Sequence, residues 1–487
     1  MSDDLLLGGA AGSQVKLALR YANRHGLVAG ATGTGKTVTL QCLAEGFSDA
    51  GVPVFLADVK GDLSGLASAG SSSTAVEERV AHIGMDGFHP RPYPVAFWDL
   101  FGERGVSVRT TVTEMGPQLL ARLLELNDTQ EGVLTLLFEV ADDEGLLLVD
   151  LADLRTGLAY LAEHAGELAG TVRVARSSVD AILRRLLVLE RAGGDRFFGE
   201  PALALDDLMQ CARDGRGVVN ILAAETLIDN PRAYAMFLLW LLAELFETLP
   251  EVGDPDKPVL VFFFDEAHLL FRDAPSVLLE KVEQVVRLIR SKGVGVWFVT
   301  QSPADIPDPV LAQLGNRVQH ALRAYTPKER RAVRVAAESF RPNPALDTAA
   351  VIGELGVGEA LVSTLGPKAV PTPVERVLLR PPYSRMGPLG DAERVALVAG
   401  DPNQRRYAQA VDPRSAHEIL RERMEKARQE AGSNKAQAQT PAGKGRSRGR
   451  ESAGEAFVKS VARSLGSATG RRLGERLLRG VLGSLLK

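Results

Sequence analysis

Residues 30–37 of the chain are Gly30-Ala31-Thr32-Gly33-Thr34-Gly35-Lys36-Thr37. It matches the pattern G-x-x-x-x-G-K-[ST] at every fixed position, which is the signature of a phosphate-binding loop. The glycines permit backbone conformations in which successive N–H groups face phosphate oxygens at the start of a helix. The flanking residues have the structure that this motif requires, because the pattern of residues 25–29 predicts a strand and that of residues 36–50 predicts a helix. We therefore expect Lys36 to neutralise the β- and γ-phosphates of a nucleotide and the Thr37 hydroxyl to bind Mg²⁺.

A second motif places two adjacent carboxylates at the end of an apolar strand. Residues 259–264 are mostly large and apolar and lead into Asp265 and Glu266, and such runs are typical of parallel strands that are buried on both faces. Ligands bind at the carboxyl ends of parallel strands, so this pair is expected to face the nucleotide. The pattern is that of a Walker B motif, in which Asp265 holds the Mg²⁺ shell and Glu266 acts as general base on the attacking water. An acidic N-cap of the following helix is the alternative interpretation.

Further candidates follow other predicted strands. Gln301 comes after the apolar run 296–299, so its amide can reach the γ-phosphate or the lytic water, although it also fits the start of a turn. Asp58 is interpreted either as support for the metal shell or as part of a charged turn. An arginine donated across a subunit boundary can stabilise the transition state, whereas a surface salt bridge is the alternative for each arginine. The arginine candidates are Arg290, Arg317 and Arg323. The nucleotide-binding candidates are Gly30, Ala31, Thr32, Gly33, Thr34, Gly35, Lys36, Thr37 and Thr39.

Length and composition set the class of protein. The chain has 487 residues, of which 45% are hydrophobic and 24% are charged, as in globular proteins with several domains of roughly 150 residues. The two cysteines, Cys42 and Cys211, are too few for a disulfide framework or a Cys-based zinc site.

The acidic start is unlike a secretion signal, and the apolar run 235–243 is much shorter than the roughly 20 residues that cross a bilayer. We therefore expect a cytoplasmic protein. Three histidines lack metal-ligand spacing and are interpreted as structural, namely His25, His268 and His320.

Strand and helix patterns alternate around the phosphate loop, which predicts an α/β core with a mostly parallel sheet and helices on both faces. A long stretch of helical periodicity interrupts this alternation and is interpreted as an inserted helical subdomain. The expected units are a first part of the core at 1–109, the helical insertion at 110–215, a second part of the core at 216–390, C-terminal helices at 391–431, a flexible linker at 432–454 and a basic amphipathic helix at 455–487.

Positive charge is concentrated at the C-terminal end. The whole chain has a formal net charge of −4, whereas residues 444–487 carry 11 Lys and Arg against 3 Glu. Apolar residues recur at helical spacing between the arginines of 455–487, which predicts a basic amphipathic helix. Such a helix fits a nucleic-acid-binding arm, a helix on a membrane surface or a partner-docking helix.

With these motifs, the chain resembles the HerA/FtsK superfamily of P-loop motor ATPases, and in particular bacterial HerA-like proteins of the YjgR type. The resemblance implies a RecA-like P-loop NTPase core, hexameric rings, hydrolysis of ATP with Mg²⁺ by Asp265, Glu266 and Gln301, and translocation on double-stranded DNA. HerA itself carries an N-terminal β-barrel, which we do not expect here because the phosphate loop begins at Gly30. The likeness covers most of residues 1–425, and the segments that carry it are 23–37, 58–62, 264–268, 291–295 and 300–303.

Three functional hypotheses follow. The first is a ring-forming, Mg²⁺-dependent ATPase that translocates on or unwinds DNA, with DNA bound in the channel and by the basic tail. The second is a motor that acts on protein or at the membrane surface through residues 455–487. The third is a nucleotide-gated scaffold without useful hydrolysis. Glu266 argues against the third hypothesis, because a switch needs no general base beside its metal ligand.

Overall fold

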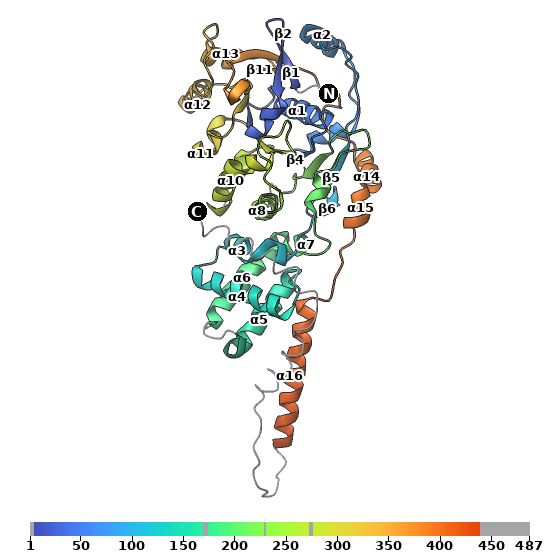
Figure 1. Cartoon of the computed structure of the whole chain (residues 1–487), viewed down its shortest axis with the longest axis vertical. Helices are drawn as coiled ribbons and strands as arrows, with labels where there is room; N and C mark the ends of the chain where they lie inside the picture. Colours follow the sequence, from blue (N-terminus) through green and yellow to red (C-terminus); the bar gives the residue numbers. More distant parts are fainter. Residues whose placement is uncertain (1–3, 169–173, 228–229, 272–275, 439–487) are drawn as a thin grey trace.

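The computed structural model describes residues 4–168, 174–227, 230–271 and 276–438 of the chain (Figure 1). Its strands are β1 (Asp4–Ala10), β2 (Ser13–Ala18), β3 (Gly26–Ala29), β4 (Val54–Asp58), β5 (Val95–Asp99), β6 (Val106–Ser107), β7 (Val219–Ala223), β8 (Leu260–Phe264), β9 (Val294–Thr300), β10 (Asn316–Gln319), β11 (Glu359–Ser363) and β12 (Glu375–Leu379). The α-helices are α1 (Lys36–Asp49), α2 (Thr74–Ile83), α3 (Val112–Leu123), α4 (Asp128–Glu144), α5 (Leu151–Leu168), α6 (Arg176–Leu189), α7 (Asp195–Phe197), α8 (Pro231–Thr248), α9 (His268–Phe271), α10 (Ser276–Leu288), α11 (Asp308–Leu311), α12 (Pro327–Glu338), α13 (Thr348–Glu354), α14 (Asp391–Gly400), α15 (Pro402–Tyr407) and α16 (Ala416–Ala438).

The strands form one 12-stranded sheet in the order β2-β1-β12-β11-β10-β3-β9-β8-β4-β7-β5-β6. Neighbouring strands are parallel from β10 to β6. Antiparallel pairing extends the sheet from β10 through β11, β12 and β1 to β2. The predicted α/β fold with a mostly parallel sheet is therefore confirmed.

Strand β8 shows why the central strands are apolar throughout. Successive side chains of a strand point to opposite faces of the sheet. Phe262 and Phe264 enter the hydrophobic core shared with α8 and α10, whereas Val261 and Phe263 enter the core shared with α1. Both faces are covered, so no position in this strand favours a polar residue until the strand ends at the edge of the sheet.

Helices α3 to α6 lie together beyond one face of the sheet, and α16 extends alongside them (Figure 1). The start of α16 is fixed by the buried carboxylate of Asp153 on α5. Its Oδ1 accepts hydrogen bonds from the Ser415 hydroxyl at 2.5 Å and from the His417 N–H at 2.7 Å. The C-terminal part of the described chain is thereby attached to helices that come from its middle.

One boundary differs from the sequence-based expectations. The helical stretch expected to end at 431 continues as α16 to Ala438, since no proline interrupts it before Pro441. The remaining part of the predicted linker and the basic helix at 455–487 lie outside the described residues. No helix within the described ranges is long and apolar enough to cross a membrane.

Candidate nucleotide site

The phosphate loop is held by backbone hydrogen bonds to both neighbours of β3. The Gly30 N–H donates to the Thr300 carbonyl at 3.2 Å, and the Ala31 N–H donates to the Ala321 carbonyl at 2.8 Å. Gly30 is required here, because a Cβ at this position would lie 2.4 Å from the Cβ of His320. Gly35 is the N-cap of α1 and has a φ of 109°, a conformation that glycine adopts without steric cost. The sequence of the loop thus directs the free N–H groups at the start of α1 toward the open edge of the sheet.

Lys36 folds back over this loop. Its side chain is buried, and its Nζ donates hydrogen bonds to the carbonyls of Gly30 at 2.7 Å and Ala31 at 3.1 Å. Burial lowers the pKa of Lys36, against the attraction of the nearby Glu266 carboxylate. The ammonium is therefore held by two neutral acceptors, and it can exchange them for a more strongly bound anion.

Asp265 carries an unsatisfied oxygen at the end of β8. Its side chain is 3% exposed, and its Oδ2 has no hydrogen-bond partner within the described residues. Burial, followed by the repulsion of Glu266, raises the pKa of Asp265 to about 6. An unpaired buried polar atom costs roughly 1–3 kcal/mol, so this carboxylate fits a site where a ligand completes its bonding.

Asp62 and Thr37 complete an oxygen-rich group beside Asp265. The Thr37 side chain is a hydrogen-bonding neighbour of the Asp62 carboxylate, and Asp62 Oδ1 is also without a hydrogen-bond partner in the described part of the chain. Carboxylate and hydroxyl oxygens suit Mg²⁺, which keeps several waters and needs few protein ligands. No cluster of three or more His, Cys, Asp or Glu able to hold a metal occurs in the described ranges.

Glu266 is held by three polar neighbours. Its Oε1 forms an ion pair with Lys60, while its Oε2 lies 3.4 Å from Gln301 Nε2 and 3.2 Å from His268 Nδ1. Burial alone would raise the pKa of Glu266, but the hydrogen bond and charge of Lys60 bring it below its ordinary value. Its backbone φ of 46° is left-handed, which costs a residue with a Cβ about 1–2 kcal/mol. Strain of this kind persists where the surroundings fix it and is concentrated at functional sites.

The structure brings Lys36, Asp265, Glu266 and Gln301 together at the carboxyl ends of β3, β8 and β9, which are neighbours in the sheet. Other predicted residues serve the surrounding backbone. The Thr39 hydroxyl contacts the Gly35 carbonyl and His320 Nε2. The Asp58 carboxylate accepts the N–H groups of Lys60, Gly61 and Leu63 at 3.2, 2.8 and 3.0 Å and so shapes the loop after β4.

Two of the three candidate arginines lie at the edge of the sheet opposite the phosphate loop, and the third lies on the side of the loop. Arg290 precedes β9 and lies 3.8 Å from Asp254. Arg317 starts β10 and donates to the carbonyls of Leu314 and Leu311, each at 3.2 Å. Both are at the amino edge of the parallel strands, opposite the phosphate loop. Arg323 follows β10 on the phosphate-loop side and is exposed.

Sequence reasoning missed four side chains that line the site. Lys60 and Asp62 follow β4, and His268 and His320 follow β8 and β10. Both histidines had been interpreted as structural. Burial lowers the pKa of His320 to about 4, and the nearby Lys36 ammonium adds to that shift, so the ring is neutral beside the loop at pH 7. The signal that these four residues share is their position directly after a parallel strand, where side chains reach the ligand crevice.

A phosphate loop between β3 and α1, with a buried carboxylate at the end of a neighbouring parallel strand, defines a RecA-like P-loop NTPase. The model of the family described as "Helicase HerA-like C-terminal" matches residues 4–487. The chain therefore belongs to this HerA-like family, as the sequence motifs indicated. No curated protein matches the chain.

Solved structures share the fold at low sequence identity. The plasmid coupling protein TrwB in complex with the non-hydrolysable ATP analogue ADPNP is 17% identical, with a TM-score of 0.51 over 79% of this chain and 91% of that one. The bacterial conjugative coupling protein TrwBΔN70 in its unbound form is 17% identical, with a TM-score of 0.50 over 79% of this chain and 92% of that one. VirB4 of Thermoanaerobacter pseudethanolicus is 15% identical, with a TM-score of 0.47 over 78% of this chain and 97% of that one.

Proposed function

We propose that this protein hydrolyses ATP with Mg²⁺ and uses the energy to move along double-stranded DNA as a ring-forming motor. The observation that carries the hydrolytic part is the convergence of Lys36, Asp265, Glu266 and Gln301 at adjacent strand ends. The DNA part is supported by membership of a HerA-like helicase family. The structural relative TrwB is a conjugative coupling protein that binds an ATP analogue, which supports ATP as the nucleotide.

Each residue has a distinct role in this proposal. The loop N–H groups and Lys36 would bind the phosphates, and the Thr37 hydroxyl, Asp265 and Asp62 would hold Mg²⁺ and its water shell. When bound, Mg²⁺ neutralises charge that develops on the phosphate oxygens. Glu266 accepts a proton from the attacking water as general base. Gln301 orients Glu266 and the water by its amide. Of the three arginines, Arg323 is our candidate for action across a subunit boundary, because the other two already bond within their own chain.

The first test measures steady-state ATP turnover with and without linear double-stranded DNA at two salt concentrations. It compares the full chain with a chain truncated after Ala438, where the described helix α16 ends. A DNA motor is expected to show strong stimulation that weakens at higher salt, since phosphate contacts release counterions. Loss of stimulation on truncation would assign the basic tail to DNA. Glu266→Gln is the matched control, because it removes the base and keeps the side-chain volume.

Other results would redirect the proposal. Full turnover in Glu266→Gln would contradict hydrolysis at this site. Turnover that is indifferent to DNA, with tail-dependent flotation on liposomes, would favour the motor that acts on protein or at the membrane. Tight ATP binding with negligible turnover would favour the nucleotide-gated scaffold. Mass photometry with a non-hydrolysable ATP analogue tests the hexamer, and a purely monomeric chain under these conditions would exclude the ring.

A further inference from the structure

Lys60 forms an ion pair with Glu266, the carboxylate that is proposed as the general base. It follows β4, directly beside β8 in the sheet, and its ammonium pairs with Glu266 Oε1. The second oxygen of Glu266 faces Gln301 and His268. Both oxygens of the carboxylate are therefore engaged by protein groups. A general base must instead direct a lone pair at the proton that it removes.

The two partners of this ion pair differ in freedom. The Glu266 side chain is 6% exposed and is fixed by its neighbours, whereas the Lys60 side chain is 42% exposed. A lysine ammonium is a point charge on a flexible four-carbon stem, so Lys60 can move without changing the backbone. Asp58 fixes the backbone on either side of Lys60 through the N–H groups of Lys60 and Gly61. The Lys60 ammonium can therefore move while the backbone of residues 60–61 stays in place.

Lys60 also lies near Lys36, the lysine that is expected to bind the phosphates. The positive charge of Lys60 lowers the pKa of Lys36, so the two ammonium groups lie within electrostatic range of each other. Lys60 is further attracted by Asp265 and Asp62. The terminal phosphate of a nucleotide held by Lys36 would enter between these groups, and its charge would compete with Glu266 for Lys60.

We propose that Lys60 is a sensor of the terminal phosphate, which leaves Glu266 for a nucleoside triphosphate and thereby frees Glu266 to act as base. With a diphosphate, Lys60 stays on Glu266 and the base remains engaged. This inference rests on the proposed function, because it takes Glu266 as the general base. Lys60 is a positioning residue for Glu266 in the unliganded state and a phosphate ligand in the triphosphate state.

The test compares equilibrium binding of ADP and of a non-hydrolysable ATP analogue, by calorimetry with Mg²⁺, in the full-length protein. A charge-assisted hydrogen bond is worth roughly a ten- to hundredfold change in affinity. Lys60→Ala is therefore expected to reduce the preference for the triphosphate over the diphosphate by at least about tenfold, and Lys60→Arg is expected to retain most of it. A lysine that binds only Glu266 throughout would change both affinities equally, and that result would overturn the proposal.

Lys257→Ala is the matched control. Lys257 is an exposed lysine that donates to the carbonyls of Ala50 and Gly51, beyond the far end of α1 from the loop, and its loss should leave the nucleotide preference unchanged. If Lys60→Ala melts at a lower temperature, Lys60→Met keeps the aliphatic stem and allows the same comparison.

Turnover separates the two proposals. Loss of turnover in Glu266→Gln together with an unchanged triphosphate preference in Lys60→Ala would reject the sensor and leave the hydrolytic function standing. Full turnover in Glu266→Gln would reject the proposed function itself. For a sensor, Lys60→Ala should raise KM for ATP about as much as it weakens binding of the triphosphate analogue and should lower kcat less, because Glu266 is no longer engaged by Lys60 in this variant.

Discussion

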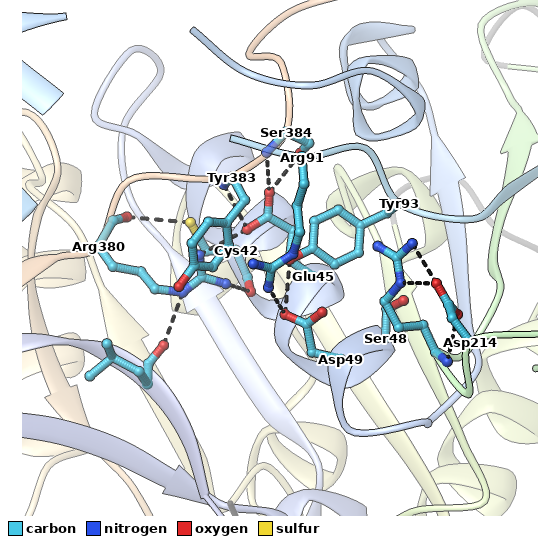
Figure 2. A network of polar contacts seen from close by, with 12 residues as sticks. Cys42, Glu45, Ser48, Asp49, Arg91, Tyr93, Asp214, Arg380, Tyr383 and Ser384 are labelled. Carbon is cyan, nitrogen blue, oxygen red and sulfur yellow. Dashed lines mark hydrogen bonds and ion pairs between the residues drawn. The ribbon is translucent and has the colours of Figure 1, made fainter. Parts of the chain in front are cut away.

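Helix α1 contacts two clusters of charged side chains that differ in how completely they are bonded. At its N-terminal end, Lys36 lies near Glu266 and Asp265, where Asp265 Oδ2 has no partner among the described residues and Glu266 has a left-handed backbone. Further along the helix, Glu45 pairs with Arg380, and the side chains of this pair are 0% and 3% exposed (Figure 2). We call the first cluster open, because one of its carboxylate oxygens has no partner among the described residues. We call the second cluster closed, because its charged groups are paired and shielded from solvent.

The Glu45 cluster satisfies nearly every polar group that it buries. Glu45 accepts hydrogen bonds from the N–H groups of Tyr383 and Ser384, from the Ser384 hydroxyl and from Arg380 Nη1. Arg380 also donates to the carbonyls of Leu6, Pro381 and Cys42. These bonds attach the segment after β12 to α1 and β1. A buried ion pair is tolerated when its remaining donors and acceptors are also bonded, so this cluster supports the fold.

Completeness of hydrogen bonding distinguishes the structural charge cluster on α1 from the candidate functional one. In the Glu45 cluster, the carboxylate and the guanidinium find their partners within the chain. In the cluster around Lys36, Asp265 Oδ2 has no partner among the described residues, and the cluster lies at the carboxyl edge of parallel strands. Burial alone does not separate them, because Asp265 and Glu45 are both buried.

The largest expected effect comes from breaking the closed cluster. Glu45→Ala leaves the Arg380 guanidinium buried without its counter-charge, which costs about 3–5 kcal/mol of unfolding free energy. Equilibrium urea unfolding followed by circular dichroism measures this loss. Glu45→Gln keeps the side-chain volume and an acceptor, so its loss should be smaller. A loss below about 1 kcal/mol in Glu45→Ala would mean that the pair does not support the fold.

Breaking the open cluster should act on turnover instead. Lys36→Ala removes a charge that stabilises the phosphates, and removal of one such group costs roughly 10²- to 10³-fold in kcat. Its unfolding free energy should change by about 1 kcal/mol or less, because the ammonium donates only to two neutral carbonyls. Turnover assays and urea unfolding on the same preparation give both values. A stability loss as large as that of Glu45→Ala would show that the two clusters do not differ as described.

Buried His25 allows the stability contribution of a fully bonded buried group to be tested by its dependence on pH. Its Nε2 lies 2.7 Å from the Val286 carbonyl and its Nδ1 accepts the Val296 N–H at 3.0 Å, so both ring nitrogens are bonded, as in the closed cluster. Burial lowers the pKa of His25 to about 4. The unfolded chain therefore takes up a proton between pH 6.5 and 4 that the folded chain does not, and the contribution of His25 to stability is present above pH 6.5 and is lost as pH falls.

The measurement is the unfolding free energy of the wild type and of His25→Phe at pH 7 and at pH 5. The penalty of the substitution should be smaller at pH 5 by about 2 kcal/mol, because the wild type alone loses this contribution. Other titrating groups, including Asp265 with its raised pKa, cancel in the difference between the two proteins. Equal penalties at both pH values would mean that His25 is not held neutral in the folded state.

The smallest effect is expected at an exposed pair. Arg185 on α6 and Glu125 approach to 2.9 Å, but their side chains are 48% and 55% exposed. Solvent screens such pairs, so Arg185→Ala should change the unfolding free energy by less than about 1 kcal/mol and should leave turnover unchanged. Urea unfolding at low and high salt is the check. A loss comparable with that of Glu45→Ala would show that completeness of bonding does not decide the stability contribution.

The sequence predicted the strands in the middle of the sheet well and the strands toward its two ends poorly. The apolar run at 259–264 corresponds to β8 and the run at 296–299 lies in β9, because strands buried on both faces are apolar throughout. The outer strands β2 and β1 at one end of the sheet, and β5 and β6 at the other end, were not predicted. The segment of β1 contains Gly8 and Gly9, which do not signal a strand by composition, and β1 is stabilised by pairing with β12 from the far end of the chain.

For the candidate site, the sequence predicted the residues whose spacing is local. The phosphate loop and the Asp265-Glu266 pair each lie in one short stretch, so a pattern detects them. Neither Lys60 nor Asp62 was proposed as a site residue from the sequence. Whether a charged residue after a strand is solvated or directed at a carboxylate depends on which strand lies beside it, and no local pattern contains that information.

The sequence by itself determined the phosphate loop, the carboxylates after β8 and the α/β class, because each depends on residues close together in the chain. The tertiary structure decided that β4 lies beside β8 and that β9 lies between β8 and β3, which brings Lys60, Glu266 and Gln301 into contact. It also decided that Glu45 and Arg380 are closed off from solvent. Strand order is set by the packing of helices over both faces of the whole sheet, so the partners of each charge become defined only when the sheet has formed.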